Sequence, residues 1–365
     1  MSIGGGAAGG ARHLTALARE SRPAGSETEE RARRYAEQVL EGAGFTITRE
    51  PFTYSEFPGR YATPIGGAIG ALTVLAAASF GLTHPAAFGP LAALAVGLLV
   101  LGAFVWSMLG DAVLNLPLRR ANGVNLIATR GSGAPRAWLV AHLDSKSQPV
   151  PSLLRVAGIM MLASALVLAT IAAVLQLASL PNRMLWWLAA VDALVGAVPV
   201  LASVVGARSP GALDNASGVA AVLAAAEMLD PKSAVGILLP SAEELGLAGA
   251  RAWARAHVPG VALNCDGVDD EGELTIMHGT NPPMEVIDAV RRVAPQEPRV
   301  RRMPLGLLTD SVALADRGWR TVTISRGSLA SLRRVHTPDD SLATLRGTGV
   351  DEMAAVLARA AEALS

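Results

Sequence analysis

Carboxylate and imidazole side chains occur in this 365-residue chain directly after apolar segments and beside turns. Seven residues have this character: His142, Asp144, Asp214, Glu243, Glu244, Asp266 and His336. A site for a divalent metal ion requires such groups, delivered from several strand ends to one place. The pattern therefore predicts a metal centre.

Each of these residues alone has a simpler structural explanation. An aspartate before an Ala-rich segment, such as Asp214, is commonly an N-cap that accepts hydrogen bonds from free N–H groups. An adjacent pair such as Glu243 and Glu244 is commonly the solvated start of a helix. A single histidine such as His336 is commonly a surface or capping residue. The metal interpretation therefore depends on the whole set.

The local sequences around these residues resemble those of the M28 family of zinc aminopeptidases, in which two zinc ions act together. The matching segments are 141–144, 211–218, 241–246, 264–266 and 336–338, and the segment 22–26 is similar to the family's opening. The resemblance covers about residues 12–57, 121–148 and 209–365. The whole set occurs in the family's order and local context. Separate structural explanations for each residue therefore account poorly for the pattern.

The resemblance implies a role for each metal-binding residue. Asp214 would bridge the two zinc ions. His142 and Asp266 would complete one site, and Glu244 and His336 would complete the other. Each ion would then keep a position shared with a bridging water, which is the open position that a catalytic site needs.

The resemblance also implies roles for residues that do not bind metal. Glu243 would be the general base, which takes the proton of the attacking water and passes it to the leaving amine. Asp144 would orient a metal-bound imidazole or carboxylate. The peptide bond between Asp214 and Asn215 is expected to be cis, as it often is in similar enzymes.

Two positions depart from the family pattern. Val335 stands where similar enzymes commonly have a tyrosine that can hydrogen-bond the tetrahedral intermediate. The segment 309–311 reads Thr-Asp-Ser where many relatives have Ser-Asp-His, so Asp310 is expected to remain as an orienting carboxylate. Neither departure removes a metal ligand, but both leave the rate and the substrate open.

The elements that must position these residues alternate between strands and helices. Strands are expected over 45–50, 122–129, 136–141, 234–239, 260–264, 273–277 and 321–325. Helices are expected over 13–19, 26–42, 214–229, 246–257, 283–294, 310–317 and 348–363. With the resemblance, this alternation predicts an α/β fold with a mixed, mostly parallel central sheet and helices on both faces. His142, Glu244 and Asp266 fall just past strand ends, where such sheets place their sites.

Two regions that interrupt this domain carry almost no charge. Residues 61–110 contain no Asp, Glu, Lys or Arg, and residues 156–207 carry only Arg183 and Asp192. Each region divides into halves of about 20 residues, the length that crosses a bilayer core. The mean hydropathy of +0.38 also points to a membrane. We therefore expect four transmembrane helices, at about 63–83, 86–108, 153–178 and 184–206, inserted as two hairpins.

The expected organisation is a flexible tail, a discontinuous M28-like catalytic domain and two transmembrane hairpins. The tail covers 1–10, the catalytic domain covers 11–60, 118–150 and 208–365, and the hairpins cover 61–110 and 152–207. The second hairpin separates His142 from Asp214, which are 72 residues apart in the sequence. We therefore expect the chain to leave and re-enter the catalytic domain beside the metal ligands.

Two features of the fourth apolar segment carry expectations of their own. Asp192 lies well inside it, either as a partnered side chain that fixes helix packing or as a functional carboxylate. The pair Trp186-Trp187 lies near its start and suits the aromatic belt at a membrane interface.

Charge and cysteine content limit the partners and predict an orientation. The net charge is zero, so there is no electrostatic basis for binding nucleic acid. The single cysteine excludes an intrachain disulfide. Arginines near the ends of the four spans gather on the side of the catalytic domain: Arg60, Arg119, Arg120, Arg155 and Arg208. The positive-inside rule and a start without signal-peptide layout predict an integral, multi-pass membrane protein with a cytoplasmic catalytic domain.

The function expected from these observations is that of a membrane-anchored aminopeptidase. It would hydrolyse N-terminal residues from peptides with two zinc ions and a Glu general base, and its partners would be a peptide substrate and the lipid bilayer. A glutaminyl cyclase shares the fold but uses one zinc ion, and retention of all five ligands argues against it. A carboxypeptidase or dipeptidase remains open, because the sequence does not show whether the pocket binds an amine or a carboxylate.

Two further alternatives are not metallopeptidases. An inactive receptor-like or scaffold protein of this fold usually loses metal ligands, and here none is lost. A transporter role would make Asp192 central, but one charge in four spans is thin support for it.

Overall fold

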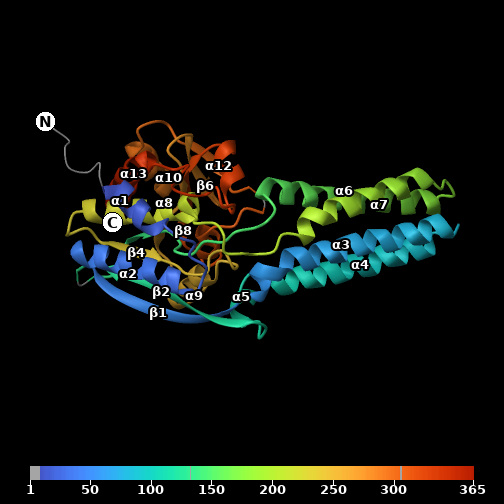
Figure 1. The fold of residues 1–365 in the computed structure, drawn as a ribbon, viewed down its shortest axis with the longest axis horizontal. Coiled ribbons are helices and arrows are strands. Elements are labelled where there is room, and N and C mark those ends of the chain that lie inside the picture. Colours follow the sequence, from blue (N-terminus) through green and yellow to red (C-terminus); the bar gives the residue numbers. More distant parts are fainter. Residues whose placement is uncertain (1–8, 132, 305) are drawn as a thin grey trace. The chain divides into compact units, whose positions relative to one another are not determined.

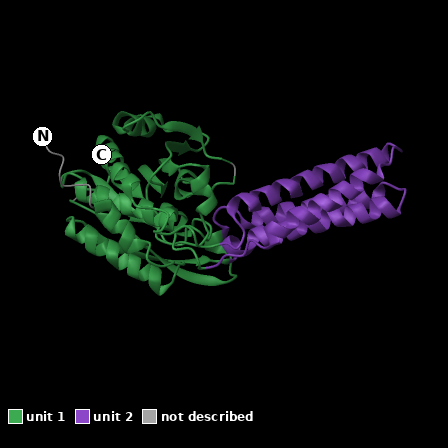
Figure 2. Ribbon diagram, turned by 45° about the horizontal axis from the view of Figure 1, so that its top comes forward, with its two compact units in different colours: residues 1–56, 113–147, 207–365 green, residues 57–112, 148–206 purple. Residues whose placement is uncertain are grey.

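The structure is a computed structural model, and it describes residues 9–131, 133–304 and 306–365. The chain divides into two compact units (Figure 2). Unit 1 comprises Met1–Glu56, Val113–Ser147 and Ala207–Ser365, and unit 2 comprises Phe57–Ala112 and Gln148–Gly206. Both units are therefore discontinuous in sequence.

Unit 1 is built on an eight-stranded sheet (Figure 1). Its strands are β1 (Thr46–Ser55), β2 (Arg120–Thr129), β3 (Ala137–Val140), β4 (Val235–Leu239), β5 (Val261–Val268), β6 (Glu273–His278), β7 (Arg299–Arg302) and β8 (Arg320–Gly327). The order is β1-β2-β4-β3-β5-β8-β6-β7. The four central strands β4, β3, β5 and β8 pair in parallel, and so do β6 and β7. The other pairs are antiparallel, so the predicted mixed, mostly parallel sheet is confirmed.

Helices connect the strands and cover the sheet. They are α1 (Gly9–Leu17), α2 (Glu27–Gly42), α8 (Ser217–Met228), α9 (Ala248–Ala256), α10 (Met284–Val293), α11 (Asp310–Ala315), α12 (Leu329–Arg334) and α13 (Thr348–Leu364). A short helix, α5 (Ala112–Asn115), precedes β2, and a π-helical turn, η1 (Ala212–Ala216), precedes α8. Helix α2 begins after Ser26, whose side chain accepts a hydrogen bond from the backbone N–H of Glu29 at 3.2 Å.

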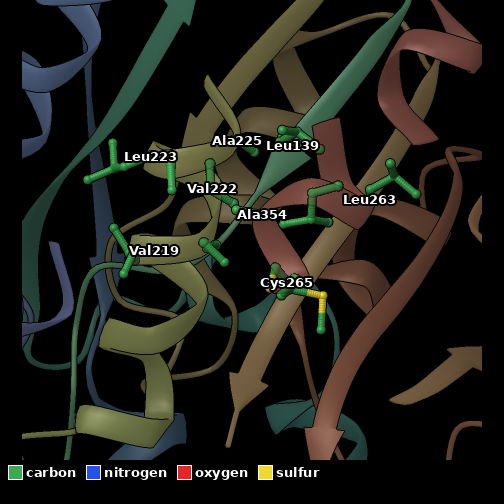
Figure 3. Packing of buried hydrophobic residues seen from close by; sticks show 14 of the residues in the cluster. Leu139, Val219, Val222, Leu223, Ala225, Leu263, Cys265 and Ala354 are labelled. Carbon is green, nitrogen blue, oxygen red and sulfur yellow. The ribbon is translucent and has the colours of Figure 1, made fainter. Parts of the chain in front are cut away.

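Both faces of the sheet are buried. Successive residues of its central strands belong to two different hydrophobic clusters, one on each face. Leu139 and Ile237 belong to the larger cluster, which includes α1, α2, α8 and α13. Their neighbours Trp138 and Leu238 belong to the cluster with α9 and α11. Successive residues of a strand point to opposite faces, so one apolar strand serves both layers. Figure 3 shows the first layer, where Val219, Val222, Leu223 and Ala225 of α8 pack beside residues of β3, β5 and α13.

Unit 2 consists of four apolar helices. They are α3 (Phe57–Thr83), α4 (Phe88–Met108), α6 (Ser152–Leu177) and α7 (Arg183–Leu201). All four are long and apolar enough to cross a membrane. Helices α3 and α4 form one hairpin in the sequence, and α6 and α7 form the other.

Small residues bring the helices of unit 2 close together. A Cβ atom on Gly158 of α6 would lie 2.7 Å from the carbonyl oxygen of Gly196 of α7, and one on Gly196 would lie 2.9 Å from that of Gly158. Buried alanines of α6 and α7 continue this contact along both helices. Close backbone approach over small residues is typical of helices that pack within a membrane.

A polar link ties the two hairpins of unit 2 to each other. Gln176 donates from Nε2 to the carbonyl oxygen of His84 at 2.7 Å and accepts from the Trp186 indole at 3.1 Å. Trp186 is therefore buried inside the unit, and only Trp187 is exposed. Of the two tryptophans expected in an interfacial belt, Trp186 therefore faces the interior of the unit, and the belt itself stays a prediction.

Several element boundaries differ from the expected ones. Helix α3 begins at Phe57, and helix α7 ends at Leu201, soon after Pro199. Helix α1 begins at Gly9, inside the segment expected to be a tail, and the rest of that segment lies outside the described residues. Apolar composition locates such helices well but does not define their ends.

Candidate metal centre

The parallel centre of the sheet brings the predicted residues together. Strand β3 ends at Val140, two residues before His142, and β4 ends at Leu239, four residues before Glu243. Adjacent parallel strands end at the same edge of the sheet, so the loops after them meet there. Asp266 corrects the expectation that all these groups follow strand ends. It lies within β5, where the pairing with β8 shifts register between Cys265 and Val268.

Asp214 reaches this edge from an irregular segment between the strands. It lies in η1 with non-helical backbone angles, and its bond to Asn215 is cis, as predicted. The preceding Gly211 has φ +61°, and a Cβ atom there would lie 2.4 Å from the carbonyl oxygen of Asp214. The turn therefore requires glycine at position 211.

The two carboxylate oxygens of Asp214 face two different histidines. Its Oδ1 lies 3.2 Å from His142 Nε2, and its Oδ2 lies 3.0 Å from His336 Nε2. Asp266 Oδ1 lies 3.7 Å from His142 Nε2, and Glu244 Oε1 lies 3.2 Å from His336 Nε2. Two triads result, and they share Asp214.

Each triad has the donor set of a divalent metal site. In one, ligand atoms of His142, Asp214 and Asp266 all lie within 4.8 Å of one another, and in the other so do those of Asp214, Glu244 and His336. Two oxygens and one imidazole nitrogen suit zinc and related ions and leave a position open for substrate or water.

Buried atoms without hydrogen-bond partners also fit bound ions. Among the described residues, His142 Nε2 and Glu244 Oε1 are buried and make no hydrogen bond. Buried polar atoms are nearly always satisfied in native proteins, so such atoms call for an explanation. A metal ion in each triad would supply the missing partner, and the residues present therefore fit the two ions.

Adjacent glutamates point to different parts of the site. Glu243 Oε2 lies 3.9 Å from His142 Nε2, whereas Glu244 reaches His336. They occupy an irregular loop in which the preceding Ala242 has φ +57°. The loop therefore allows two neighbours in sequence to face different parts of the site.

The side chain of Asp144 holds the backbone of this loop in place. Its Oδ1 accepts the N–H of Glu243 at 3.0 Å, and its Oδ2 accepts the N–H of Glu244 at 3.2 Å. The Asp144 side chain is fully buried, and the backbone carbonyl oxygen of Asp144 makes a hydrogen bond with His142 Nδ1 at 3.1 Å. It thus orients both the glutamate loop and a predicted ligand, which is the arrangement expected of a residue behind a metal site.

The electrostatics of the site reflect many acids in a small volume. Burial raises the pKa of Glu243 well above its usual range, and Glu244 and Asp310 raise it further. Burial alone would lower the pKa of His142, but Glu243 and the other carboxylates hold it well above its usual range. Acidic groups raise each other's pKa values because their negative charges repel, and a bound cation would relieve this repulsion.

The structure also places Asp310 and Val335, the two positions that depart from the family pattern. Asp310 begins α11, is fully buried, and neither of its carboxylate oxygens has a hydrogen-bond partner among the described residues. Burial raises its pKa to about 8. The expected orienting contact of Asp310 is therefore not present as a hydrogen bond. Val335 packs against the core and offers no donor.

Three residues that the sequence analysis gave no role position the Asp214 segment. The Arg22 guanidinium is buried and donates to four carbonyl oxygens, those of Leu17, Leu143, Pro210 and Gly211. Asp340 accepts the N–H groups of Leu213 and Asp214. Asn215 donates to the carbonyl oxygen of Cys265, beside Asp266. Each of them lies within or beside a segment that resembles the family, which marks its position as important but does not indicate its contacts.

The chain leaves and re-enters unit 1 beside this centre. Ser147, the last residue of its segment, accepts a hydrogen bond from the N–H of Arg208 at 2.8 Å. One residue before it, Lys146 reaches Glu244. The exit and return points of the second hairpin therefore lie next to each other and next to the second triad.

The fold and the sequence both have known relatives. Among solved structures, the aminopeptidase from Aneurinibacillus sp. strain AM-1 has a TM-score of 0.56 and 15% identity, and the match covers 97% of this chain and 92% of that chain. A zinc aminopeptidase from Bacillus subtilis has a TM-score of 0.56 and 13% identity, over 99% of this chain and 95% of that chain. The glutaminyl cyclase of Fimbriiglobus ruber has a TM-score of 0.54 and 13% identity, over 98% of this chain and 94% of that chain. These likenesses establish the fold.

The sequence itself determines the family. No curated protein matches the chain significantly. The model of the family described as "Peptidase family M28" matches residues 125–361, which is more than half of the chain and contains both triads. The chain belongs to peptidase family M28.

Proposed function

We propose that this protein is a membrane-anchored aminopeptidase that uses two zinc ions. The observation that carries the proposal is Asp214, whose two oxygens face His142 and His336 and so serve two triads at once. In one triad Asp266 is the third ligand, and in the other it is Glu244. Membership of a peptidase family supports peptide hydrolysis as the reaction.

Two bound ions would supply Lewis-acid chemistry, by acidifying a water molecule and polarising the scissile carbonyl group. The protein's own contribution to proton transfer is Glu243, which makes no part of either triad. Its carboxylate accepts the proton of the attacking water and donates it to the leaving amine. In the metal-free protein burial raises the pKa of Glu243, and two bound cations would lower it again and so favour the ionised form that accepts a proton.

Asp144 keeps this base in place. Because its carboxylate holds the N–H groups of both Glu243 and Glu244, the general base and a metal ligand move as one loop. Positioning of this kind is worth a large share of catalysis, because small displacements of a reacting group are costly.

In the proposed function, unit 2 anchors the enzyme in a lipid bilayer. Its four helices expose large apolar side chains that water would not favour, such as Phe88, Leu99 and Trp106 of α4. A lipid bilayer is the solvent that such a surface suits. The arginines near the span ends support a cytoplasmic catalytic domain in this proposal, by the positive-inside rule. Labelling of single introduced cysteines in intact cells tests this side, and labelling of unit 1 from outside would contradict it.

Glutaminyl cyclase is the second candidate. The observation in its favour is the fold, since the cyclase from Fimbriiglobus ruber is nearly as similar to this chain as the aminopeptidases are. That reaction releases ammonia from an N-terminal glutamine and hydrolyses no peptide bond. The products therefore separate the two candidates.

The experiment compares four substrate types with detergent-purified, zinc-loaded protein. They are aminoacyl anilides, N-acetylated anilides, peptides with a free N-terminal glutamine, and N-blocked peptides with a free C-terminus. The proposal expects cleavage of the first and third types, which have a free amine, and no cleavage of the two blocked types. Cyclisation without cleavage would establish the cyclase, and cleavage of only the last type would establish a carboxypeptidase.

A further inference from the structure

Lys146 places a positive charge against the second triad. Its Nζ lies 2.6 Å from Glu244 Oε2, and the side chain is largely buried, with 16% exposed. Glu244 therefore has two different oxygens. Its Oε1 faces His336, whereas its Oε2 is held by the ammonium group.

The backbone on both sides of Lys146 is fixed. Ser145 accepts the N–H of Arg22 on its hydroxyl at 2.9 Å and donates to the carbonyl oxygen of Ser209 at 3.2 Å. Ser147 accepts the N–H of Arg208 at 2.8 Å. Because both neighbours are tied to other segments, the lysine is presented to the site by a rigid loop.

We propose that Lys146 is a positioning residue for Glu244, which leaves Glu244 a single oxygen for the ion of the second triad. This inference rests on the proposed function, because it assumes an ion in that triad. A carboxylate whose second oxygen is taken by a lysine binds a metal through one oxygen only. A free carboxylate would be able to bind through both and fill the position that substrate or water needs.

The charge of Lys146 has a second consequence. The ammonium lies beside the carboxylate that binds the ion, so it opposes the approach of a second cation. The shared ligand Asp214, by contrast, carries a negative charge that attracts a cation. Lys146 thus lowers the affinity of the second triad for its ion and leaves one coordination position open for substrate or water.

The test uses the full chain in detergent micelles with its metal removed by a chelator. Zn²⁺ is titrated by calorimetry, which gives the number of ions and a Kd for each. Co²⁺ is then bound in its place, and its visible absorption reports the coordination number, because tetrahedral Co²⁺ absorbs far more strongly than six-coordinate Co²⁺. Neither readout requires enzymatic turnover.

Three variants are compared with the wild type. Lys146→Met removes the charge at similar length, and Lys146→Gln serves in its place if the methionine variant does not fold. Lys146→Arg keeps the charge and the hydrogen bond. Lys232→Met is the matched control, because Lys232 is exposed and lies in the turn after α8.

The proposal expects the uncharged variants to bind the second ion at least about tenfold more tightly, with weaker Co²⁺ absorption from a higher coordination number. The K146R and K232M variants should match the wild type. An unchanged or weaker second Kd in K146M, or an unchanged spectrum, would overturn the role of Lys146. A wild-type protein that binds fewer than two ions would instead overturn the two-ion function itself.

Discussion

The carboxylate of Asp340 accepts the backbone N–H of Asp214 at 3.1 Å. Its other oxygen accepts the neighbouring N–H of Leu213 at 2.5 Å. The residue that both triads share is therefore held by a second, buried carboxylate that belongs to neither triad. Asp340 follows His336 by four residues, so one short segment supplies a predicted ligand and the support of another.

Asp340→Asn is expected to weaken metal binding. An amide presents one N–H₂ group to a backbone donor, so one of the two hydrogen bonds is lost and a buried donor is left unpaired. Such a loss costs about 1–3 kcal/mol. If half of this loss in free energy falls on metal binding, the Kd for Zn²⁺ rises about twofold to twelvefold.

Asp339→Asn is the matched control for this change. Asp339 precedes Asp340 in the chain, but its side chain is exposed. Calorimetric titration of both variants with Zn²⁺ is the measurement. Equal affinities in the two variants would show that Asp340 does not support the bridging aspartate.

Glu29→Gln is expected to flatten the pH dependence of stability. Burial raises the pKa of Glu29 to about 7, and nearby Asp144 contributes. A carboxyl group whose pKa is raised on folding stabilises the protein below the unfolded value of about 4.5, and this stability is lost as the pH rises through about 7. Ionisation of Glu29 therefore lowers the free energy of unfolding by about 3 kcal/mol between pH 4.5 and pH 7.

The measurement is the free energy of unfolding of metal-free protein between pH 4.5 and pH 8. The wild type should lose more stability than the E29Q variant over this range. Comparison with the wild type isolates Glu29, because Asp340 has a pKa raised by burial to about 7 and contributes equally in both proteins. Parallel curves would contradict the prediction.

Gly158→Ala is expected to destabilise unit 2. The added methyl group would lie 2.7 Å from the carbonyl oxygen of Gly196 and 2.6 Å from Pro199 Cγ, so α6 and α7 must move apart. Overpacking of this kind costs about 1–3 kcal/mol. Unfolding in mixed detergent micelles, followed by circular dichroism, measures the cost.

Gly102→Ala is the control for the helix packing. A Cβ atom on Gly102 of α4 meets nothing within 4 Å, and alanine is the better helix former. This variant should be as stable as the wild type or slightly more stable. Equal destabilisation by both changes would mean that the close contact of α6 with α7 does not contribute.

The sequence allowed much of the fold to be predicted, because its signals are local. Alternating strands and helices indicated the α/β class, and the charge-poor runs at 61–110 and 156–207 located the four apolar helices. Strand ends placed His142 and Glu244 at one edge of the sheet. Asp266 was placed past a strand end and instead lies within β5, because the register shift beside it is not visible in one strand's sequence.

Contacts between distant segments were not predictable in this way. Arg22 donates to carbonyl oxygens of three separate segments, and nothing in its own neighbourhood indicates them. The contact of Lys146 with Glu244 joins residues 98 apart in the sequence, and the burial of Trp186 depends on Gln176 across a helix pair. Periodicity and composition describe single helices and strands. They do not indicate which distant residues come into contact when the chain folds.

The most direct test of the two-ion account counts metal ions and turnover in two adjacent variants. The wild type should bind two Zn²⁺ ions per chain and cleave a free-amine anilide. Glu243→Gln should keep both ions and lose turnover by about 10²-fold or more, because the general base is gone. Glu244→Gln should keep one tightly bound ion. An active Glu243→Gln variant, or a Glu244→Gln variant that still binds both ions tightly, would contradict the account.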